Sequence, residues 1–428
     1  IWRFPYLAAK YGGGIFLLIY ILLALTFGYT MIVAESALGR MTRKSPVGAF
    51  KAFGKKAGWL SFGGWINAII PVLIVPYYSV IGGWVIKYLI EYVKGNGTKL
   101  AADGYFSEFI SNGASTEICF VIFCLFTLSI IYAGVRNGIE RVSKFMMPIL
   151  VVLSVIIAIY SVTRPGAIEG VKYFLVPNLK NFSWMTVVAA MGQMFYSLSI
   201  AMGILITFGS YMKKDSSIED STRNVEVFDT AIAIMAGLMI IPAVFAFSGG
   251  NPDTLQAGPA LMFITIPKVF ENMGLGTAIG ILFFLLVLFA ALTSSIALTE
   301  SAVSTFEDEI GWSRKKSTVL VGVIMIVLGS LSSLGYGPLA FVKIIGMQFL
   351  DFFDFLTNSV MMPIAALMTS LLVARVVGVK KIEEEIIHGE NAFRRKKIFA
   401  VMIKYLCPIF VLIILISSVA NAFGWISM

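Results

Sequence analysis

The sequence has little charge and almost none of the residues that metal sites and acid–base enzymes most often use. Only 13% of its 428 residues are charged, and it contains one histidine and three cysteines. The histidine, His388, lies in a charged loop, which argues against histidine-based catalysis. Cys119, Cys124 and Cys407 lie in apolar runs without the spacing of a metal site or a disulfide framework, so we expect buried packing residues.

Apolar residues, by contrast, make up 58% of the chain, and the mean hydropathy is +0.88. We therefore interpret residues 1–428 as a single polytopic membrane domain rather than as several soluble domains. Residues 1–10 would form a helix only about 15 Å long, which we interpret as the outer half of a span whose beginning is absent. Longer apolar runs predict ten complete spans, at 14–40, 61–93, 117–134, 142–163, 184–212, 226–248, 276–306, 318–334, 341–373 and 400–425.

Lysine and arginine residues gather in alternate loops between these spans. The basic stretches lie at 40–56, 136–144, 213–223, 314–316 and 375–404. Because basic loops stay in the cytoplasm, we predict that the initial fragment ends outside the cell and that the C-terminus is extracellular. The net charge of +9 is therefore a signal of topology, and we predict no nucleic-acid partner.

One predicted span is interrupted near its middle by small and hydroxyl residues. Residues 192–203 read GQMFYSLSIAMG, and the fragment at the N-terminus runs into a glycine-rich turn at 11–14. Broken helices at matching positions of two halves indicate a transporter's binding site, because freed backbone groups in a bilayer need protein, water or ligand as partners. The alternative is that Ser197, Ser199 and Gly203 merely allow close helix packing.

A second group of hydroxyls lies in the span at 276–306. Thr293, Ser294 and Ser295 follow one another near its middle. Hydroxyl and carbonyl oxygens are hard ligands that suit a small cation. Alternatively, each hydroxyl bonds back to the carbonyl one turn earlier in its own helix. We favour the cation site, because three hydroxyls in a row repeat the pattern of the interrupted span.

Charged residues inside membrane segments are functional candidates by default. Arg3 lies in the initial fragment, and it could pair across an external vestibule with Asp351 or Asp354, or simply reach the interface. Glu35 and Asp229 lie deeper. An isolated carboxylate at that depth would rather be neutral, and a bound sodium ion would reverse that preference.

Seven segments, in order, carry a resemblance to a known family: RFPYLAAKYGGG, ESALGR, VPYYSVIGGW, GQMFYSLSIAMG, SYMKKD, LTSSIAL and FEDEIGWSR. They resemble the neurotransmitter:sodium symporter family, in particular its bacterial members with eleven spans, from residue 1 to about 360. The resemblance implies an all-α polytopic fold, a five-plus-five inverted repeat with discontinuous helices 1 and 6. Repeat one would cover about 1–163 and repeat two about 184–373, followed by an extra helix at about 400–425.

The resemblance also implies roles for individual residues. Tyr78 would bind the substrate carboxylate, and Tyr196 would form a lid over the site. Ser197 and Asp229 would hold a first sodium ion. The carbonyl of Ala290, with Thr293 and Ser294, would hold a second. The whole substrate-binding set is Ile74, Tyr78, Tyr196, Ser197, Ser199, Met202, Ser295 and Leu298. Its side-chain pocket has no charged member, so we expect a neutral, apolar or aromatic amino acid.

Gates and an anion region follow from the same resemblance. Arg3 and Asp354 resemble an external gate, and Tyr211 and Asp308 resemble half of a cytoplasmic gate. Tyr20 and Gln193 match two residues of the chloride site of chloride-dependent members. Those members have an asparagine and, one turn later, a serine, where this chain has Asp229 and Ala233. We infer that Asp229 replaces the charge of chloride and that transport is independent of chloride.

The sequence thus predicts a sodium-coupled importer in the cell (plasma) membrane, with two Na⁺ sites and no organic cofactor, working as a monomer or weak homodimer. The runner-up is a sodium-independent or proton-coupled permease of the same fold. Thr293 and Ser294 favour sodium, because a lysine commonly replaces that ion in such relatives. A channel fits the paired gates less well. A membrane enzyme would need a nucleophile–base constellation or a metal cluster, and the sequence has neither.

Overall fold

The computed structural model describes residues 3–249, 258–390 and 392–425, and within these ranges the regular structure is helical, with one isolated bridge between Ile344 and Met347. Nine helical stretches are long and apolar enough to cross a membrane. They are Gly14–Thr42 (α2, η1 and α3), Gly58–Val93 (η3 and α5), Gly113–Tyr132 (α8), Val135–Val162 (η4 and α9), Ile218–Ser248 (α13), Gly276–Ile310 (α15), Arg314–Leu334 (α16), Phe349–Val377 (α17, η8, α18 and η9) and Lys396–Asn421 (α20, η10 and most of α21).

Nine of the ten predicted spans coincide with these stretches, with one clear error in a boundary. The predicted span at 341–373 begins only at Phe349. The residues before it form a tight turn, in which Ile345 and Gly346 have positive φ angles of 53° and 78°. A left-handed backbone cannot continue an α-helix, so the apolar character of this segment is not evidence of a span.

The tenth predicted span, at 184–212, is broken in the structure. It consists of α11 (Trp184–Ser197) and α12 (Ile204–Tyr211), joined by the irregular segment Leu198–Gly203. At 14 and 8 residues, the two pieces are about 21 and 12 Å long, so neither crosses a bilayer alone. The prediction of an interrupted helix is therefore confirmed.

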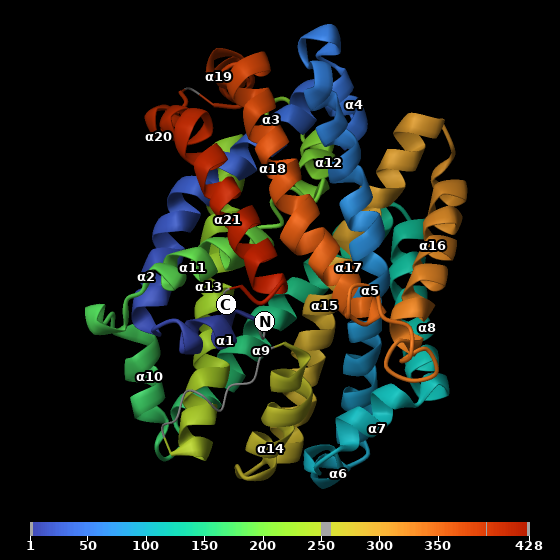
Figure 1. The fold of residues 1–428 in the computed structure, drawn as a ribbon, viewed down its shortest axis with the longest axis vertical. Coiled ribbons are helices and arrows are strands. Elements are labelled where there is room, and N and C mark those ends of the chain that lie inside the picture. The colour runs from blue at the N-terminus through green and yellow to red at the C-terminus, as the bar shows by residue number, and fades with distance from the viewer. Residues whose placement is uncertain (1–2, 250–257, 391, 426–428) are drawn as a thin grey trace.

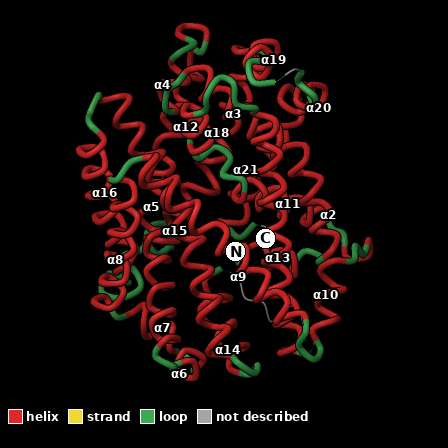
Figure 2. Tube along the Cα trace, turned by 180° about the vertical axis from the view of Figure 1, so that it is seen from behind, coloured by secondary structure: helices red, strands yellow, loops and turns green. Residues whose placement is uncertain are grey.

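Shorter elements lie at the two ends of the bundle (Figure 1). One end, called here the α19 end, carries α4 (Pro46–Lys51), α19 (Val379–Ile387) and α20 (Lys396–Val401). The opposite end, called the α14 end, carries α6 (Gly97–Ala101), α7 (Tyr105–Ser111) and α14 (Ile266–Glu271). The remaining elements are α1 (Arg3–Lys10), α10 (Ala167–Leu175), η2 (Gly54–Lys56), η5 (Leu179–Asn181) and η7 (Leu261–Thr265). Seen from behind, helices make up almost all of the trace (Figure 2).

Two contacts fix the loops and helices around the broken span. At the α14 end Lys268 of α14 pairs with Asp103, and this ammonium lowers the pKa of the exposed Asp103 carboxyl. Nearer the α19 end, α12 packs directly on α3 (Tyr29–Thr42). A Cβ on Gly39 would lie 2.0 Å from the Ile206 carbonyl oxygen, so only glycine allows the two backbones to approach this closely.

Candidate functional site

The site is built around the break between α11 and α12. Ser199, Ala201 and Gly203 have φ angles of 55°, 58° and 71°, which end one helix before the next begins. A Cβ at position 203 would lie 2.7 Å from the Asn67 carbonyl oxygen, so this position requires glycine for space as well as for conformation. The first turn of α12 presents backbone N–H groups that have no acceptor within their own helix.

Glu35 of α3 supplies a partner for this freed backbone. Its side chain is fully buried, and its Oε1 accepts a hydrogen bond of 2.9 Å from the Ala201 N–H. Within the described residues its Oε2 has no hydrogen-bond partner. The sequence identified Glu35 as a buried charge but gave it no place in the site. The structure places it against the break.

Asp229 of α13 brings three of the predicted residues together. Its Oδ1 accepts a hydrogen bond of 2.5 Å from Ser197, and its Oδ2 accepts one of 2.5 Å from Tyr20 of α2 (Gly14–Leu23). We call these three residues the Asp229 cluster. Gln193 is buried one turn before Ser197 on α11, and its Oε1 has no partner in the described chain. The residues predicted for the first sodium ion and for the anion region therefore share one carboxylate.

The hydroxyls of α15 point in different directions. Thr293 donates to the carbonyls of Phe289 and Ala290, each 3.0 Å away, which is the bonding to its own helix considered above as the alternative. This bond uses the hydroxyl proton and leaves the oxygen's lone pairs available to a cation. Ser294 is exposed and interacts with Tyr78 of α5 (Phe62–Val93).

The predicted side-chain pocket is brought together only in part. Ile74, Met202 and Leu298 are buried, at 1%, 4% and 4% exposure, whereas Ser199 is half-buried. Ser295 is fully buried, and its hydroxyl lies 3.1 Å from that of Thr127 on α8. The Ser295 side chain therefore contacts a neighbouring helix instead of presenting a free hydroxyl to a substrate.

The predicted external gate residues lie near one another without pairing. The Arg3 guanidinium lies 5.1 Å from the centre of the Tyr196 ring. Asp354 instead accepts hydrogen bonds from Tyr77, at 3.2 Å, and from Asn358, at 2.5 Å. In the described residues no ion pair within 4.0 Å joins Arg3 to Asp354. A cleft of about 450 Å³ lies beside Asp354.

At the α19 end, Tyr211 has a partner that the sequence did not predict. Its hydroxyl donates to Glu300 of α15 at 2.7 Å, and Arg314 pairs with the same carboxylate at 2.5 Å. Asp308 instead accepts a hydrogen bond from the Ser45 N–H at 2.5 Å. Glu300 lies two turns before Asp308 on the same helix, so Tyr211 and Asp308 have different partners, and their role as half of a cytoplasmic gate stays a prediction. Glu300 could have been found as a carboxylate within a long apolar helix.

The described residues contain no group of three or more histidine, cysteine, aspartate or glutamate side chains that could hold a metal ion. The oxygens near the break come from hydroxyls, backbone carbonyls and two carboxylates, those of the buried Glu35 and the half-buried Asp229. Such a set suits a singly charged hard cation better than a transition metal.

A helical bundle with a broken central helix, a polar site at the break and polar contacts at both ends defines a polytopic membrane carrier. The chain belongs to the sodium:neurotransmitter symporter family, whose model matches residues 1–101 and 105–424. The five-plus-five fold predicted above is the fold of this family, and its members are transporters and not enzymes.

Individual relatives agree with this assignment. The chain is 33% identical to the uncharacterised sodium-dependent transporter YhdH of Bacillus subtilis, over 98% of this chain and 93% of that protein. It is 26% identical to the human sodium- and chloride-dependent GABA transporter 2, over 90% of this chain and 71% of that protein. Among solved structures it matches MhsT in complex with L-phenylalanine, with a TM-score of 0.86, 35% identity, and coverage of 98% of this chain and 94% of that one.

Proposed function

We propose that this sodium-dependent transporter imports a neutral, apolar or aromatic amino acid. The observation that carries the proposal is the character of the predicted lining side chains, of which Ile74, Met202 and Leu298 are buried and none is charged. A charged substrate side chain would lose its water there without gaining a partner. The complex of MhsT with L-phenylalanine, a relative at 35% identity, supports the same class of substrate.

The α-carboxylate and α-amino groups of such a substrate need polar partners at the break. We assign the carboxylate to the Tyr78 hydroxyl and to the first turn of α12, whose N–H groups and helix dipole attract an anion. Tyr196, whose ring centre lies 5.1 Å from the Arg3 guanidinium, would cover this position as a lid.

We further propose two sodium sites. Ser197 and Asp229 would hold the first ion, close enough to the bound carboxylate for substrate and ion to strengthen each other's binding. The Ala290 carbonyl, Thr293 and Ser294 would hold the second. The 3.0 Å hydrogen bond from Thr293 to the Ala290 carbonyl supports this second site, because it brings two hard oxygens onto one turn of α15.

The Asp229 cluster supports transport that is independent of chloride. Tyr20 and Ser197 both direct hydroxyl protons at the Asp229 carboxylate. A carboxylate that receives two such bonds supplies a fixed negative charge beside the first sodium ion. We therefore propose that this charge takes the place of a chloride ion.

Transport would follow alternating access, and the contacts at the two ends indicate which side is open. Arg3 and Asp354 are unpaired with each other, whereas Tyr211, Glu300 and Arg314 are joined. We infer an arrangement open at the α14 end and closed at the α19 end. The basic loops gather at the α19 end, which we assign to the cytoplasm, with the C-terminus outside a plasma membrane. We also propose the repeat boundaries given above and expect the protein to work as a monomer or weak homodimer.

Equilibrium binding to the purified full-length protein tests the substrate class. A panel of labelled leucine, phenylalanine, tryptophan, glutamate and lysine is measured in sodium and in potassium buffers. We expect binding of the three apolar or aromatic members in sodium, at least tenfold weaker binding of glutamate and lysine, and loss of binding in potassium. Equal binding in potassium, or preference for a charged member, would contradict the proposal.

A further inference from the structure

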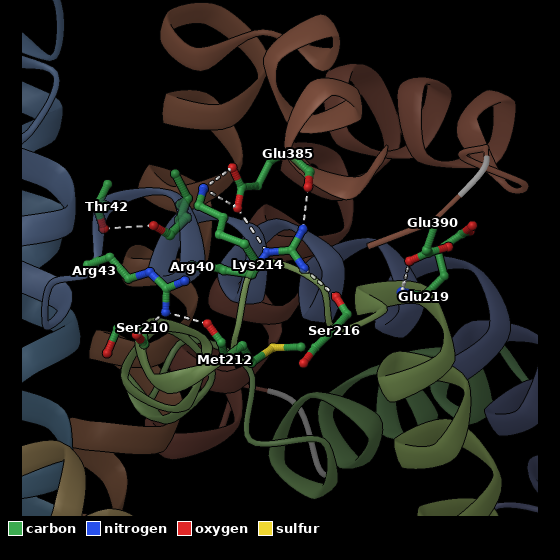
Figure 3. Close-up of polar contacts among 11 residues, drawn as sticks. Arg40, Thr42, Arg43, Ser210, Met212, Lys214, Ser216, Glu219, Glu385 and Glu390 are labelled. Atoms are coloured by element: carbon green, nitrogen blue, oxygen red, sulfur yellow. Dashed lines mark hydrogen bonds and ion pairs between the residues drawn. The ribbon is translucent and has the colours of Figure 1, made fainter. Parts of the chain in front are cut away.

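The segment that joins the last two spans is attached to the loop after α12 by a set of polar contacts (Figure 3). This segment consists of α19 and the residues up to Arg395. The loop, Met212–Ser217, connects α12 to α13, and it directly follows the gate residue Tyr211. These contacts involve none of the residues predicted for the gate, the substrate site or the ion sites.

Arg40 of α3 is the centre of the first group of contacts. Its side chain is 0% exposed, and its Nε pairs with Glu385 of α19 at 2.9 Å. Its Nη1 donates to the Ser216 carbonyl, and its Nη2 donates to the Glu385 carbonyl. Lys214 binds both carboxylate oxygens of Glu385, at 2.9 and 2.8 Å. Glu385 therefore ties α3 and the loop to one point on α19.

A second cation fixes the loop on the other side of the gate residue. Arg43 donates from its Nη1 to the carbonyls of Ser210 and Met212, which flank Tyr211. Further along, Glu219 at the start of α13 accepts from the backbone N–H of Arg394, at 2.8 Å, and its own N–H donates to Glu390, at 2.8 Å. The backbone on both sides of Tyr211 is thus held by side chains of α3 and by the segment after α19.

Burial distinguishes these contacts from those of the gate. Breaking a buried ion pair by removing one partner typically costs about 3–5 kcal/mol, whereas an exposed pair contributes about 0–1 kcal/mol. Arg40 and Glu385 are 0% and 5% exposed. In the gate the Glu300 carboxylate is fully buried, but its partners Tyr211 and Arg314 are 40% and 21% exposed. Lys51 and Glu309, which pair nearby between α4 and α15, are 49% and 19% exposed. The weaker gate contacts are the ones that can open during a transport cycle.

We propose that Glu385 is a positioning residue for the gate: through Arg40 and Lys214 it holds the loop after α12 so that Tyr211 reaches Glu300. The contact between α19 and the loop stays closed throughout transport, and only the contact between Tyr211 and Glu300 breaks when the α19 end opens. The inference rests on the proposed alternating access, but its test requires no transport.

The test measures how often the seam between α12 and α15 opens. Thr207 and Ser304 face each other across this seam, with their hydroxyls 3.2 Å apart. The parent is Ser304→Cys, and the rate at which a maleimide labels it is measured in nanodiscs, where both ends of the protein are accessible. The three native cysteines are buried, so background labelling is low.

We expect Glu385→Gln to raise the labelling rate of this parent roughly tenfold, because it removes the charge that Arg40 and Lys214 contact. Tyr211→Phe should raise it by a similar factor, because it removes the hydroxyl that donates to Glu300. The double variant should label no faster than either single variant, because both act on the same contact. Glu383→Gln is the matched control, since Glu383 lies on the same helix and its one ion-pair partner among the described residues is the half-exposed Lys396. It should label at the parent's rate.

A Glu385→Gln variant that labels at the parent's rate would overturn the proposal. So would a double variant whose rate is the product of the two single effects, because Glu385 would then act independently of Tyr211. If Glu385→Gln fails to fold, Lys214→Met replaces it, since the buried pair of Arg40 and Glu385 survives in that variant. It should still raise the rate, by a smaller factor, and an unchanged rate would refute the positioning role.

Discussion

At the scale of single residues, the proposed ion chemistry of the site depends on Asp229. Its two oxygens accept from Ser197 and Tyr20, each at 2.5 Å, so the carboxylate is fixed between α2 and α11. A fixed negative charge in a half-buried position is worth more to a bound cation than the same charge in bulk water. Asp229 therefore belongs both to the proposed first sodium site and to the proposed replacement of a chloride ion.

The first prediction concerns this charge. Asp229→Asn keeps the shape of the side chain and removes its charge, so we expect sodium-driven uptake to fall roughly tenfold or more in chloride-free gluconate buffer. Addition of chloride should restore part of the uptake in the variant and leave the unaltered protein unaffected. Uptake by the variant at the normal rate, insensitive to chloride, would rule out the charge-replacement account.

The second prediction concerns the substrate carboxylate. Tyr78→Phe removes one hydroxyl beside Ser294 without altering the apolar ring, so we expect substrate affinity to weaken roughly tenfold. The readout is equilibrium binding of labelled phenylalanine in saturating sodium. Tyr132→Phe is the control, because Tyr132 is 49% exposed at the end of α8. Equal affinity in Tyr78→Phe and Tyr132→Phe would remove Tyr78 from the carboxylate site.

At the scale of elements, the broken helix depends on a backbone that most residues resist. Ser199 and Ala201 adopt positive φ angles, at a cost of about 1–2 kcal/mol each for an L-residue. Glu35 offsets part of this cost by accepting from Ala201. The close packing of α3 on α12, through Gly39, then holds the second half of the helix in place.

The third prediction tests the requirement for glycine at the end of the break. Gly203→Ala would bring a methyl group within 2.7 Å of the Asn67 carbonyl oxygen at a φ of 71°. We expect a lower thermal unfolding midpoint and the loss of ligand binding. Gly192→Ala is the matched control, because nothing lies within 4 Å of its added Cβ. Similar unfolding midpoints for the two variants would contradict the proposed constraint.

The sequence predicted these elements well because their causes are local. Length and hydropathy are enough to place spans, and serine and glycine at 192–203 are enough to place a break. The orientation of side chains is not local. Thr293, Ser294 and Ser295 are successive residues, so their side chains lie about 100° apart around α15, and each has a different partner. They contact, respectively, their own helix, Tyr78 and Thr127.

Side-chain partners contributed by distant helices were also beyond the sequence. Tyr211 and Asp308 were predicted as half of a cytoplasmic gate, but the sequence did not indicate that Tyr211 donates to Glu300 or that Asp308 accepts from the Ser45 N–H. Likewise the apolar residues 341–348 read as part of a span, although Ile345 and Gly346 turn the chain back on itself. Both outcomes depend on tertiary packing and not on local pattern.

At the scale of the whole molecule, the two ends of the bundle differ in their contacts. Tyr211, Glu300 and Arg314 are joined at the α19 end, whereas Arg3 and Asp354, which lies beside a cleft, form no ion pair with each other in the described residues. In the proposed cycle, the seam between α12 and α15 must open at a later step so that the substrate can leave. Buried hydroxyls, including Thr207 and Ser304, line this seam and can be solvated when it opens.

The fourth prediction concerns a disulfide that would hold this seam closed. Thr207→Cys and Ser304→Cys together place two thiols where hydroxyls now lie 3.2 Å apart, a spacing that suits a disulfide. Oxidation of the double variant in proteoliposomes should reduce uptake at least tenfold while substrate binding persists, and a reducing agent should restore uptake. Each single-cysteine variant, which cannot form this disulfide, serves as a control for the double variant. Full uptake by the oxidised, cross-linked protein would show that cargo leaves by another route.

The central claim is that the sodium gradient drives accumulation of a neutral amino acid. The most direct measurement is uptake of labelled phenylalanine into proteoliposomes containing the full-length protein, with an inward sodium gradient and no chloride. The account predicts accumulation above equilibrium, which collapses when a sodium ionophore dissipates the gradient. Accumulation that is equal without sodium, or that follows an imposed proton gradient instead, would contradict it.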